Sequence, residues 1–513
     1  MNGAESLVRT LVANGIDTCF ANPGTSEMHF VAALDKVKGM RCVLGLAETV
    51  VTGCADGYAR MSGKPAVTLM HCGPGLANGL SNVHNARRAS SPMVNIVGDH
   101  ASYHRPYDSP LTYDTEGLAR TASHWVRTSA SSKRVGPDGA AAVQAARTSP
   151  GQIATLILPA DTAWGDGGQI GEPLPLADAP KVAPETIRAI ARALRGNEPA
   201  MLVLTGKALS EEGLLAAQRV AHVTGAILRC PTQLPRMARG RGRVPVDRIP
   251  YVVDRALELF SGIRHVVLVG TRPPTSFFAY PNKPSVLAGP DSITHVLARP
   301  EQDLVGALNA LADELGAPAR VDIPVAESKP ELLKGKFEPA AFATTLAALL
   351  PENCIVAEDG VTSGRALLAP TFNAAPHDWI QITGGAIGHG FPAATGAAIA
   401  CPERKVVCLE GDGAGMYTVQ SLWTQAHEKL DVINVVFANN VYKILHGELL
   451  AVGAQPGLAS HELFDLSGPK LDWVTMANGL GVEATRVENL EGFADAFKAA
   501  SARKGPFLIE FRI

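Results

Sequence analysis

Two apolar segments in the C-terminal third each end in a short polar motif, and the spacing of these motifs constrains the fold most strongly. Lys405–Leu409 leads into Gly411-Asp412-Gly413, and Val432–Phe437 is followed by Asn439-Asn440. Asp412 and Asn439 are 27 positions apart (439 − 412), with a helical stretch between them. Each strand therefore delivers one oxygen ligand at its carboxyl end, where open α/β sheets bind ligands.

The residue types of this motif favour a phosphate group and a magnesium ion. Mg²⁺ is usually held by one or two protein oxygens together with substrate phosphates, and Asp412 and Asn439 offer such oxygens. The glycines of the motif let backbone N–H groups approach a diphosphate, and the following helix N-terminus adds a favourable dipole. The alternative is a Gly-Asp-Gly β-turn that binds nothing.

Alternating strand and helix patterns run through the rest of the chain. At 513 residues the chain is too long for one hydrophobic core. We predict an α/β fold of three doubly wound parallel-sheet domains, at residues 1–165, 185–320 and 338–513. Segments rich in glycine, proline and aspartate at Gly165–Pro184, and then Pro318–Pro339, are the predicted linkers.

Composition excludes several classes of partner and compartment. A formal charge of −3 gives no global basic field, so we expect no nucleic acid. Eight cysteines without a CxxC pair or metal spacing are typical of reduced cytoplasmic thiols. The start shows no export signal and no uncharged apolar run reaches about 18 residues, so we expect no membrane span. The arginine run Arg236–Arg243 is broken by glycines, and we expect a solvated loop there.

Three segments together resemble the thiamin diphosphate-dependent enzymes. The GDG and NN pair resembles their cofactor signature, Glu48–Arg60 resembles their ExxxxxxADGYAR segment, and Gly384–Gly388 resembles the segment that holds the cofactor bent. The resemblance covers essentially the full chain and includes benzoylformate decarboxylase, acetolactate synthase large subunits and bacterial acetolactate synthase-like proteins of about this length. It implies a pyrimidine-binding, a central and a diphosphate-binding domain in the three predicted segments.

The resemblance assigns the metal and diphosphate ligands. Aligning on Tyr442 puts Ala438-Asn439-Asn440 where Asn-Asn-Gly is expected. Asn439 is then a metal ligand with Asp412, Val441 offers a backbone carbonyl, and Asn440 stands where left-handed geometry is needed. The choice between Asn439 and Asn440 as the ligand stays open. The resemblance also places these residues against the cofactor: Gly411, Gly413, Ala414 and Tyr442.

Glu48 is the expected activating residue, because in this family the matching glutamate hydrogen-bonds N1′ of the aminopyrimidine. A carboxyl there favours the imine form of the 4′-amino group, and it works best in a dry pocket that raises its pKa. The alternative is that Glu48 only caps the following helix. By resemblance, the carbonyl of Gly385 accepts the 4′-amino group and Ile387 is the apolar wedge between the two rings.

The segments Phe20–Glu27 and Leu69–Gly79 resemble the substrate-facing loops of benzoylformate decarboxylase. His71 falls at the decarboxylase histidine, where it could donate a proton or hydrogen-bond the substrate carboxylate. Thr25 falls at the position of the family's serine, with Ser26 next to it. A satisfied core histidine and an N-capping hydroxyl are the structural alternatives. The second histidine of benzoylformate decarboxylase is replaced around Phe277.

We therefore expect thiamin diphosphate- and Mg²⁺-dependent, non-oxidative decarboxylation of a 2-oxo acid, with carboligase capability. Acetolactate synthase-type condensation is the main alternative, and a catalytically silent regulatory subunit is a third. We expect no FAD, because no additional segment is visible that would hold it. The family resemblance also implies a homodimer or homotetramer with active sites at subunit interfaces.

Overall fold

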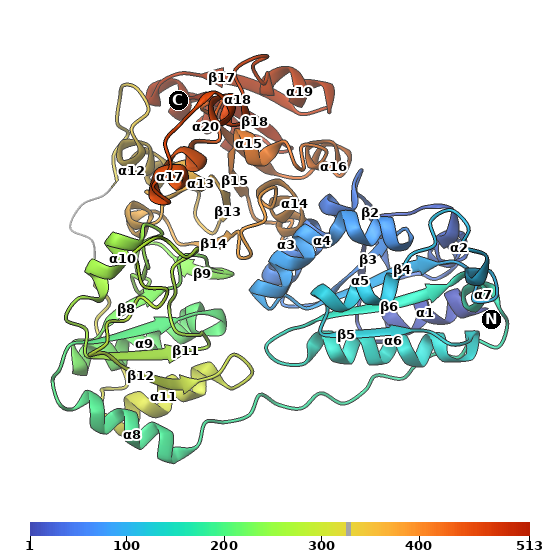
Figure 1. The fold of residues 1–513 in the computed structure, drawn as a ribbon, viewed down its shortest axis with the longest axis horizontal. Coiled ribbons are helices and arrows are strands. Elements are labelled where there is room, and N and C mark those ends of the chain that lie inside the picture. The colour runs from blue at the N-terminus through green and yellow to red at the C-terminus, as the bar shows by residue number, and fades with distance from the viewer. Residues whose placement is uncertain (325–329) are drawn as a thin grey trace.

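The chain folds around three α/β sheets built mainly from parallel strands, as the computed structural model of residues 1–324 and 330–513 shows (Figure 1). This confirms the predicted fold class. The predicted linker Pro318–Pro339 lies partly outside the described residues. Within the described ranges, no helix is both long enough and apolar enough to cross a membrane.

The first sheet is entirely parallel, in the order β2-β1-β3-β4-β6-β5. Its inner strands are mainly apolar and buried on both faces, as expected for a sheet covered by helices. The strands are β1 (Thr18–Asn22), β2 (Arg41–Leu44), β3 (Ala66–Met70), β4 (Met93–Asp99), β5 (Trp125–Thr128) and β6 (Ile153–Pro159). The helices are α1 (Gly3–Ala13), α2 (Met28–Lys36), α3 (Glu48–Ser62), α4 (Cys72–Ala89), α5 (Thr115–Ala122), α6 (Ser132–Arg147) and α7 (Ala160–Trp164).

The second sheet is also parallel, in the order β10-β8-β7-β11-β12. Its central strands are fully buried and pack against helices on both sides. The strands are β7 (Ala200–Leu204), β8 (Ile227–Cys230), β10 (Asp247–Arg248), β11 (His265–Val269) and β12 (Ile293–Ala298). The helices are α8 (Pro184–Leu194), α9 (Glu211–Thr224), α10 (Val253–Phe260) and α11 (Leu304–Glu314).

The third sheet runs in the order β17-β18-β16-β15-β13-β14-β9. Its strands are β13 (Ile355–Asp359), β14 (His377–Gln381), β15 (Val406–Gly411), β16 (Val432–Ala438), β17 (Glu483–Val487), β18 (Phe507–Arg512) and the edge strand β9 (Arg236–Arg239). Its helices are α12 (Pro339–Leu349), α13 (Val361–Gly364), α14 (Gly390–Ala400), α15 (Asp412–Gly415), α16 (Ser421–His427), α17 (Lys443–Ala451), α18 (Leu458–Phe464), α19 (Trp473–Gly479) and α20 (Leu490–Ser501).

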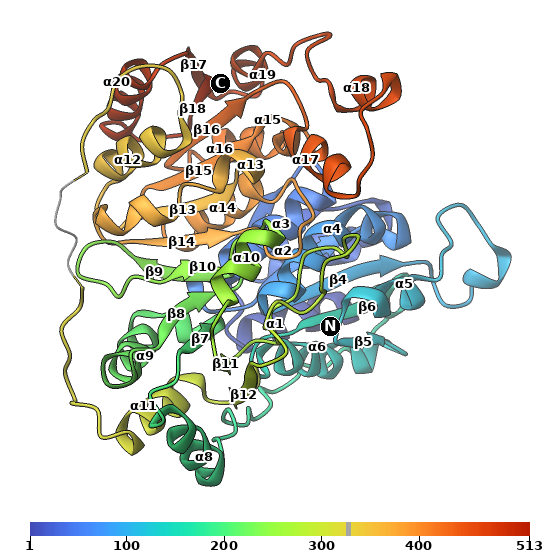
Figure 2. The ribbon, with the colours of Figure 1, turned by 60° about the vertical axis from the view of Figure 1, so that its left-hand side comes forward.

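Strand β9 corrects the expectation of a solvated arginine loop. It leaves the second unit and pairs antiparallel with β14, so that it becomes the edge strand of the third sheet (Figure 2). The Arg239 side chain is fully buried, with its guanidinium 3.9 Å from the ring centre of Phe372 and hydrogen-bonded to the carbonyl of Val246. Burial lowers the pKa of Arg239 to about 9. The expectation of a solvated loop is wrong because this segment adds a strand to the third sheet, and the sequence gives no sign of that pairing.

Helices α3 and α14 join the first and third units in close contact. A Cβ atom on Gly57 would lie 2.1 Å from the carbonyl oxygen of Ala393, and one on Gly396 would lie 1.9 Å from that of Cys54. Only glycine allows the two backbones to approach this closely. A buried network of charged and polar side chains, built on Asp56, crosses the same contact.

Candidate active site

Asp412 connects the ends of the two neighbouring strands β15 and β16. It follows Gly411, the last residue of β15, and only 3% of its surface is exposed. Its Oδ2 accepts the backbone N–H of Asn440 at 2.6 Å, and its Oδ1 accepts that of Gly413 at 2.8 Å. Both polar motifs therefore meet at one edge of the sheet, as the spacing of Asp412 and Asn439 predicts, while their role as ligands stays a prediction.

The backbone after β16 explains why an asparagine stands at position 440, where the family usually has glycine. Asn440 has φ of 53°, in the left-handed region that asparagine tolerates better than most residues. The Oδ1 atom of Asn439 accepts the N–H of Val441 at 2.9 Å, and the carbonyl of Val441 accepts the N–H of Lys443 at 2.8 Å. Asn440 thus makes the turn, while the oxygens of Asn439 and Val441 each accept a backbone N–H within the loop.

The residues of this loop fit a divalent cation. Burial raises the pKa of Asp412 to about 6, against hydrogen bonds from Asn440 and Gly413 that lower it. Among the described residues, no lysine or arginine forms an ion pair with Asp412. A buried carboxylate without a cationic partner is costly, and a bound Mg²⁺ would compensate it. A Cβ on Gly413 would lie 2.4 Å from Cε1 of Tyr442, so glycine is required there.

The glycine-rich segment before α14 is held by two buried polar side chains. Asn85 accepts the N–H of Gly384 at 3.0 Å and donates to the carbonyl of Ala386 at 2.8 Å. Asp359 accepts the N–H groups of Gly388 and His389, each at 2.9 Å. Burial raises the pKa of Asp359 to about 7, which these two hydrogen bonds oppose. Sequence reasoning missed Asn85 and Asp359, because neither belongs to a recognisable motif.

Gly385 is half-buried in the middle of this segment. It has φ of 78°, and its carbonyl receives no hydrogen bond from any described residue. That oxygen is therefore free to accept a ligand amine. Ile387, two residues later, is half-buried. A Cβ on Gly385 would lie 2.8 Å from Cζ of Phe277, which brings a loop of the second unit to the same place.

Glu48 is the first residue of α3, at the carboxyl edge of the first sheet. Its Oε2 accepts a hydrogen bond from the side-chain amide of Asn78 at 3.2 Å. Its Oε1 would lie 2.9 Å from a Cβ on Gly75, which explains the glycine at the facing turn of α4. The carboxyl is half-buried in the single chain. It follows the N-cap residue Ala47 in the first turn of the helix, where an acidic side chain is favoured, and its side chain also remains free to contact a ligand.

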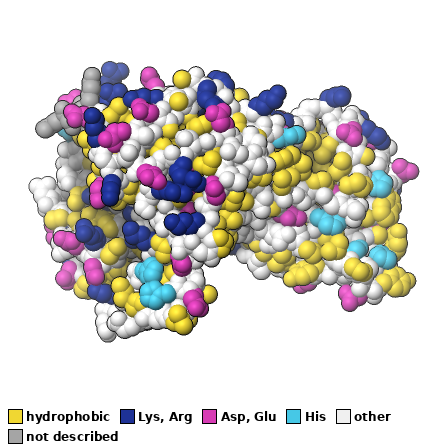
Figure 3. All heavy atoms as spheres, turned by 90° about the horizontal axis from the view of Figure 1, so that it is seen from above, with side chains coloured by type: hydrophobic (Ala, Val, Ile, Leu, Met, Phe, Trp, Pro, Cys, Tyr) yellow, Lys and Arg dark blue, Asp and Glu magenta, His cyan; other side chains and the backbone are white. Residues whose placement is uncertain are grey.

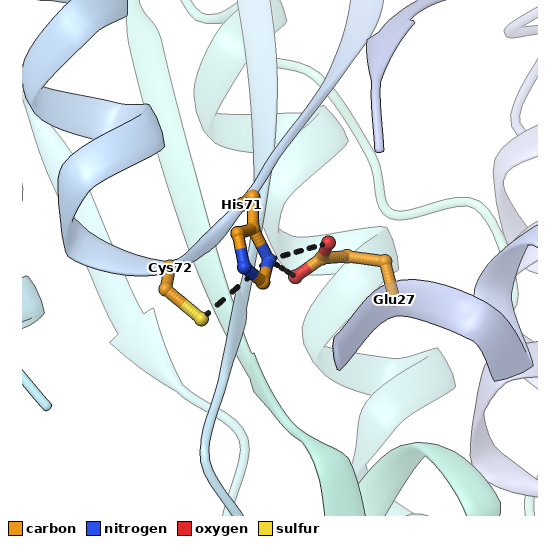
Figure 4. A group of neighbouring side chains, drawn as sticks. All are labelled: Glu27, His71 and Cys72. Carbon is orange, nitrogen blue, oxygen red and sulfur yellow. Dashed lines mark hydrogen bonds and ion pairs between the residues drawn. The ribbon is translucent and has the colours of Figure 1, made fainter. Parts of the chain in front are cut away.

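His71 is the residue before α4, and Glu27 holds its ring (Figure 4). Nδ1 of His71 lies 3.0 Å from Oε2 and 3.2 Å from Oε1 of Glu27, which is 3% exposed. The backbone N–H of Gly24 donates to the same carboxylate at 2.8 Å. A Cβ on Gly24 would lie 2.2 Å from Cγ of the imidazole, so the glycine makes room for it.

Ser26, and not Thr25, is the hydroxyl that contacts this histidine. Oγ of Ser26 lies 3.1 Å from Nδ1 of His71 and also hydrogen-bonds Glu27. Thr25 is exposed at the start of the 3₁₀ turn η1 (Thr25–Glu27). Sequence reasoning placed both hydroxyls in the pocket and missed the carboxylate of Glu27 and the thiol of Cys72. The sequence signal for Glu27 was its place directly after two hydroxyl residues.

A cavity of about 1950 Å³ lies between the three units and reaches the site from one side. Gly384 and Phe277 line it, as does His84, whose ring lies within hydrogen-bonding distance of the Gly384 carbonyl. Glu48, His71 and Asp412 do not line it. The cavity is therefore an approach to the glycine-rich segment and is separate from the pocket around His71.

The first and third α/β units each present polar and glycine-rich motifs at the carboxyl edge of a sheet, which defines the class of α/β proteins that bind ligands there. Residues 1–122 match the family described as "Thiamine pyrophosphate enzyme, N-terminal TPP binding domain", and residues 364–511 match "Thiamine pyrophosphate enzyme, C-terminal TPP binding domain". The chain belongs to the thiamine pyrophosphate enzyme family.

Individual relatives cover the whole chain. A Mycobacterium tuberculosis protein named "Putative acetolactate synthase large subunit IlvX" is 50% identical, over 99% of this chain and 98% of the relative. The benzoylformate decarboxylase of Pseudomonas aeruginosa is 27% identical, over 97% of this chain and 96% of the relative. The structure of the thiamine diphosphate-dependent 4-hydroxybenzoylformate decarboxylase of Rhodococcus jostii RHA1 has a TM-score of 0.85 at 22% identity, covering 100% and 99% of the two chains. That last likeness supports the fold alone.

Proposed function

We propose that this protein is a thiamin diphosphate- and Mg²⁺-dependent decarboxylase of a 2-oxo acid, with carboligase capability. The observation that carries the proposal is the Glu27–His71 pair, because it presents an oriented imidazole at the carboxyl edge of the first sheet. An imidazole held by a carboxylate can deliver a proton in a decarboxylation. The 27% identical benzoylformate decarboxylase supports this reading of the site.

The geometry of the two halves supports the cofactor ligands that the family resemblance implies. Asp412, Asn439 and the carbonyl of Val441 would hold Mg²⁺, with Asn440 supplying the turn. Backbone groups and packing surfaces around the diphosphate come from Gly411, Gly413, Ala414 and Tyr442. The free carbonyl of Gly385 would accept the 4′-amino group, and Ile387 would separate the two rings.

The chain's own residues would supply proton transfer and positioning. When bound, thiamin diphosphate provides a thiazolium ring that accepts the electron pair left by departing CO₂. Glu48 would share a proton with N1′ of the aminopyrimidine, which requires a carboxyl that water does not fully solvate. His71, oriented by Glu27 and Ser26, would donate a proton to the reacting carbon or hydrogen-bond the substrate carboxylate.

Acetolactate synthase-type condensation is the second candidate, and the name of the 50% identical relative favours it. Both reactions begin with decarboxylation of a 2-oxo acid, so they use Glu48 and the metal loop in the same way. They differ in what the remaining fragment bonds to after CO₂ has left: a proton in decarboxylation, or a second carbonyl compound in condensation. The oriented imidazole of His71 favours protonation.

We further propose that the active form is a homodimer or homotetramer in which the first unit of one subunit meets the third unit of another. Hydrophobic side chains gather on the face of the first unit that Figure 3 shows. Leu44 and Leu46, next to Glu48, are 39% and 42% exposed, and Leu458 and Leu463, beyond the metal loop, are 77% and 73% exposed. A second subunit would cover such apolar side chains.

The eight free cysteines support a reducing, cytoplasmic location.

Product analysis tests the proposal. Purified protein with thiamin diphosphate and Mg²⁺ is incubated with a panel of 2-oxo acids, and CO₂, aldehydes and hydroxyketones are measured. We expect aldehyde and CO₂ in equal amounts from at least one member. 2-Acetolactate from pyruvate alone would establish condensation instead, and no CO₂ from any member would favour a catalytically silent subunit.

A further inference from the structure

Glu27, His71 and Cys72 bring three metal-ligating side chains together at the first sheet's edge (Figure 4). Sγ of Cys72 lies 3.8 Å from Nδ1 of His71, and Oε2 of Glu27 lies 3.0 Å from the same nitrogen. One ligand atom from each residue lies within 4.8 Å of the other two. Among the residues that the structure describes, Glu27, His71 and Cys72 are the histidine, cysteine and acidic side chains that lie close enough together to hold a metal ion.

We propose that Glu27, His71 and Cys72 form a binding site for Zn²⁺ that is separate from the magnesium loop at Asp412. The site as such does not depend on the proposed decarboxylation. Its consequence does: an ion on Nδ1 of His71 would take the imidazole away from Glu27 and stop it from delivering a proton.

The separations of the ligand atoms suit a tetrahedral ion. Zinc bonds of about 2.3 Å to sulfur, 2.1 Å to nitrogen and 2.0 Å to oxygen place sulfur and nitrogen about 3.6 Å apart, and nitrogen and oxygen about 3.3 Å apart. The separations in the protein are 3.8 Å for Cys72 to His71 and 3.0 Å to 3.2 Å for His71 to Glu27. These two pairs need shifts of only a few tenths of an ångström, and the sulfur of Cys72 and an oxygen of Glu27 lie within 4.8 Å of each other.

The ligand types select zinc over magnesium. Thiolate and imidazole are the ligands of zinc, whereas Mg²⁺ prefers oxygen alone. Asp412, Asn439 and Val441 present oxygens only, and the cluster around His71 presents sulfur, nitrogen and oxygen. The two sites therefore discriminate between the two ions by chemistry.

Burial and protonation decide how an ion enters. Glu27 and Cys72 are 3% and 1% exposed, while the His71 side chain is 21% exposed, so the cluster opens past the imidazole. Burial raises the pKa of the Cys72 thiol to about 11, and the incoming ion must displace its proton to solvent. The imidazole would bind through Nδ1 and keep its proton on Nε2.

The hydroxyl of Ser26 lies among the three ligand atoms. Its oxygen is 3.1 Å from Nδ1 of His71 and 3.3 Å from Sγ of Cys72, and it hydrogen-bonds Glu27. An ion at the centre of the cluster would require this hydroxyl to rotate away. Ser26→Ala would remove the hydroxyl and leave the three ligands in place, so the variant should bind zinc at least as tightly as the original chain.

Cobalt titration tests the site. Co²⁺ substitutes for zinc and reports a cysteine ligand by a thiolate-to-cobalt absorption band, which an oxygen-only site does not produce. The protein is first saturated with thiamin diphosphate and excess Mg²⁺, then titrated with Co²⁺, and zinc is added to displace the cobalt. We expect the band in the original chain and in Ser26→Ala, and its disappearance on addition of zinc.

Two cysteine variants make the test specific. Cys72→Ser should lose the band, and its affinity for Co²⁺ should fall on the order of 100-fold, whereas Cys42→Ser, which changes an exposed thiol elsewhere, should keep both. If Cys72→Ser does not fold, Glu27→Gln should retain the band with affinity at least about tenfold weaker. Absence of the band in the original chain, or its persistence in Cys72→Ser, would overturn the proposal.

Discussion

Oδ2 of Asp412 accepts the backbone N–H of Asn440 at 2.6 Å, although 28 positions separate the two residues. This bond ties the carboxyl end of β15 to that of β16 and buries the carboxylate between them. The bond therefore holds the loop in a defined shape. The two asparagines after β16 differ in what they do: Asn440 makes the turn in left-handed geometry, and the side-chain oxygen of Asn439 accepts the N–H of Val441.

Substitutions at the two asparagines separate these tasks. Asn440→Gly should leave Mg²⁺ affinity nearly unchanged, because glycine adopts the φ of 53° without strain. Asn440→Ala should reduce the free energy of unfolding by about 1 kcal/mol, the usual cost of left-handed geometry. Asn439→Ala should weaken Mg²⁺-dependent binding of thiamin diphosphate at least about tenfold, measured by calorimetric titration. The opposite order of effects would make Asn440 the ligand.

Glu27→Gln tests whether the carboxylate acts through His71. We expect kcat for decarboxylation to fall on the order of 100-fold with KM nearly unchanged, because the imidazole loses its anionic partner. The double variant with His71→Ala should be no slower than His71→Ala alone, since the two residues act as a unit. Independent, multiplying effects in steady-state kinetics would show that Glu27 does not act through the histidine.

Asp56, at the contact between α3 and α14, should make the free energy of unfolding depend on pH. It is buried and bonded to Arg60 at 2.6 Å and to Nε2 of His389 at 2.8 Å. Burial alone would raise its pKa, but the charge of Arg60 and the bond from His389 lower it to about 2. Because the folded-state pKa is below the unfolded value, the carboxylate stabilises the fold above about pH 4, and this contribution of about 2 kcal/mol is lost as pH falls toward 2.

Asp56→Asn should accordingly lower the free energy of unfolding by about 3 kcal/mol near pH 7, because Arg60 is left buried without a counter-charge. The deficit should shrink between pH 4 and pH 2. Urea unfolding across this range measures both values, with the exposed Glu185→Gln as the control variant. A deficit that does not change with pH would show that the charge of Asp56 does not contribute.

Phe277 should influence substrate preference. It packs against Gly385 and lies 5.4 Å, ring centre to ring centre, from Tyr251. Phe277→Ala should change the ratio of kcat/KM between large and small 2-oxo acids by about tenfold in favour of the large ones, because it removes an apolar wall. Phe278→Ala, the more exposed neighbour at 57%, should change it little. Equal ratios in both variants and in the original chain would place the substrate elsewhere.

The sequence predicts the three sheets well because their inner strands are short, mainly apolar runs, several of which lead into glycine-rich turns. Strands β5 and β17 escape prediction, since Trp125–Thr128 and Glu483–Val487 are only partly buried and carry polar residues. β9 escapes because its partner, β14, lies about 140 positions away, as in the Arg239–His377 pair (377 − 239 = 138). No local pattern encodes such a pairing.

The site divides in the same way. Motifs with fixed spacing, such as Asp412 with Asn439, are visible in the sequence because each belongs to one strand end. Contacts between segments are not, and so the bonds of Asn85 to the glycine-rich segment and of Glu27 to His71 emerge only from the fold. The left-handed geometry of Asn440 lies between these cases, because it was inferred from a departure from the family's glycine.

The central claim, that this chain activates thiamin diphosphate through Glu48, is tested most directly without any substrate. Exchange of the C2 proton of the bound cofactor with D₂O is followed by quenched-flow NMR in the original chain and in Glu48→Gln. Exchange should be much faster with the original chain than with free cofactor, and the variant should slow it by about 10² to 10⁴. Equal exchange rates in the two proteins, with the cofactor bound to both, would contradict the claim.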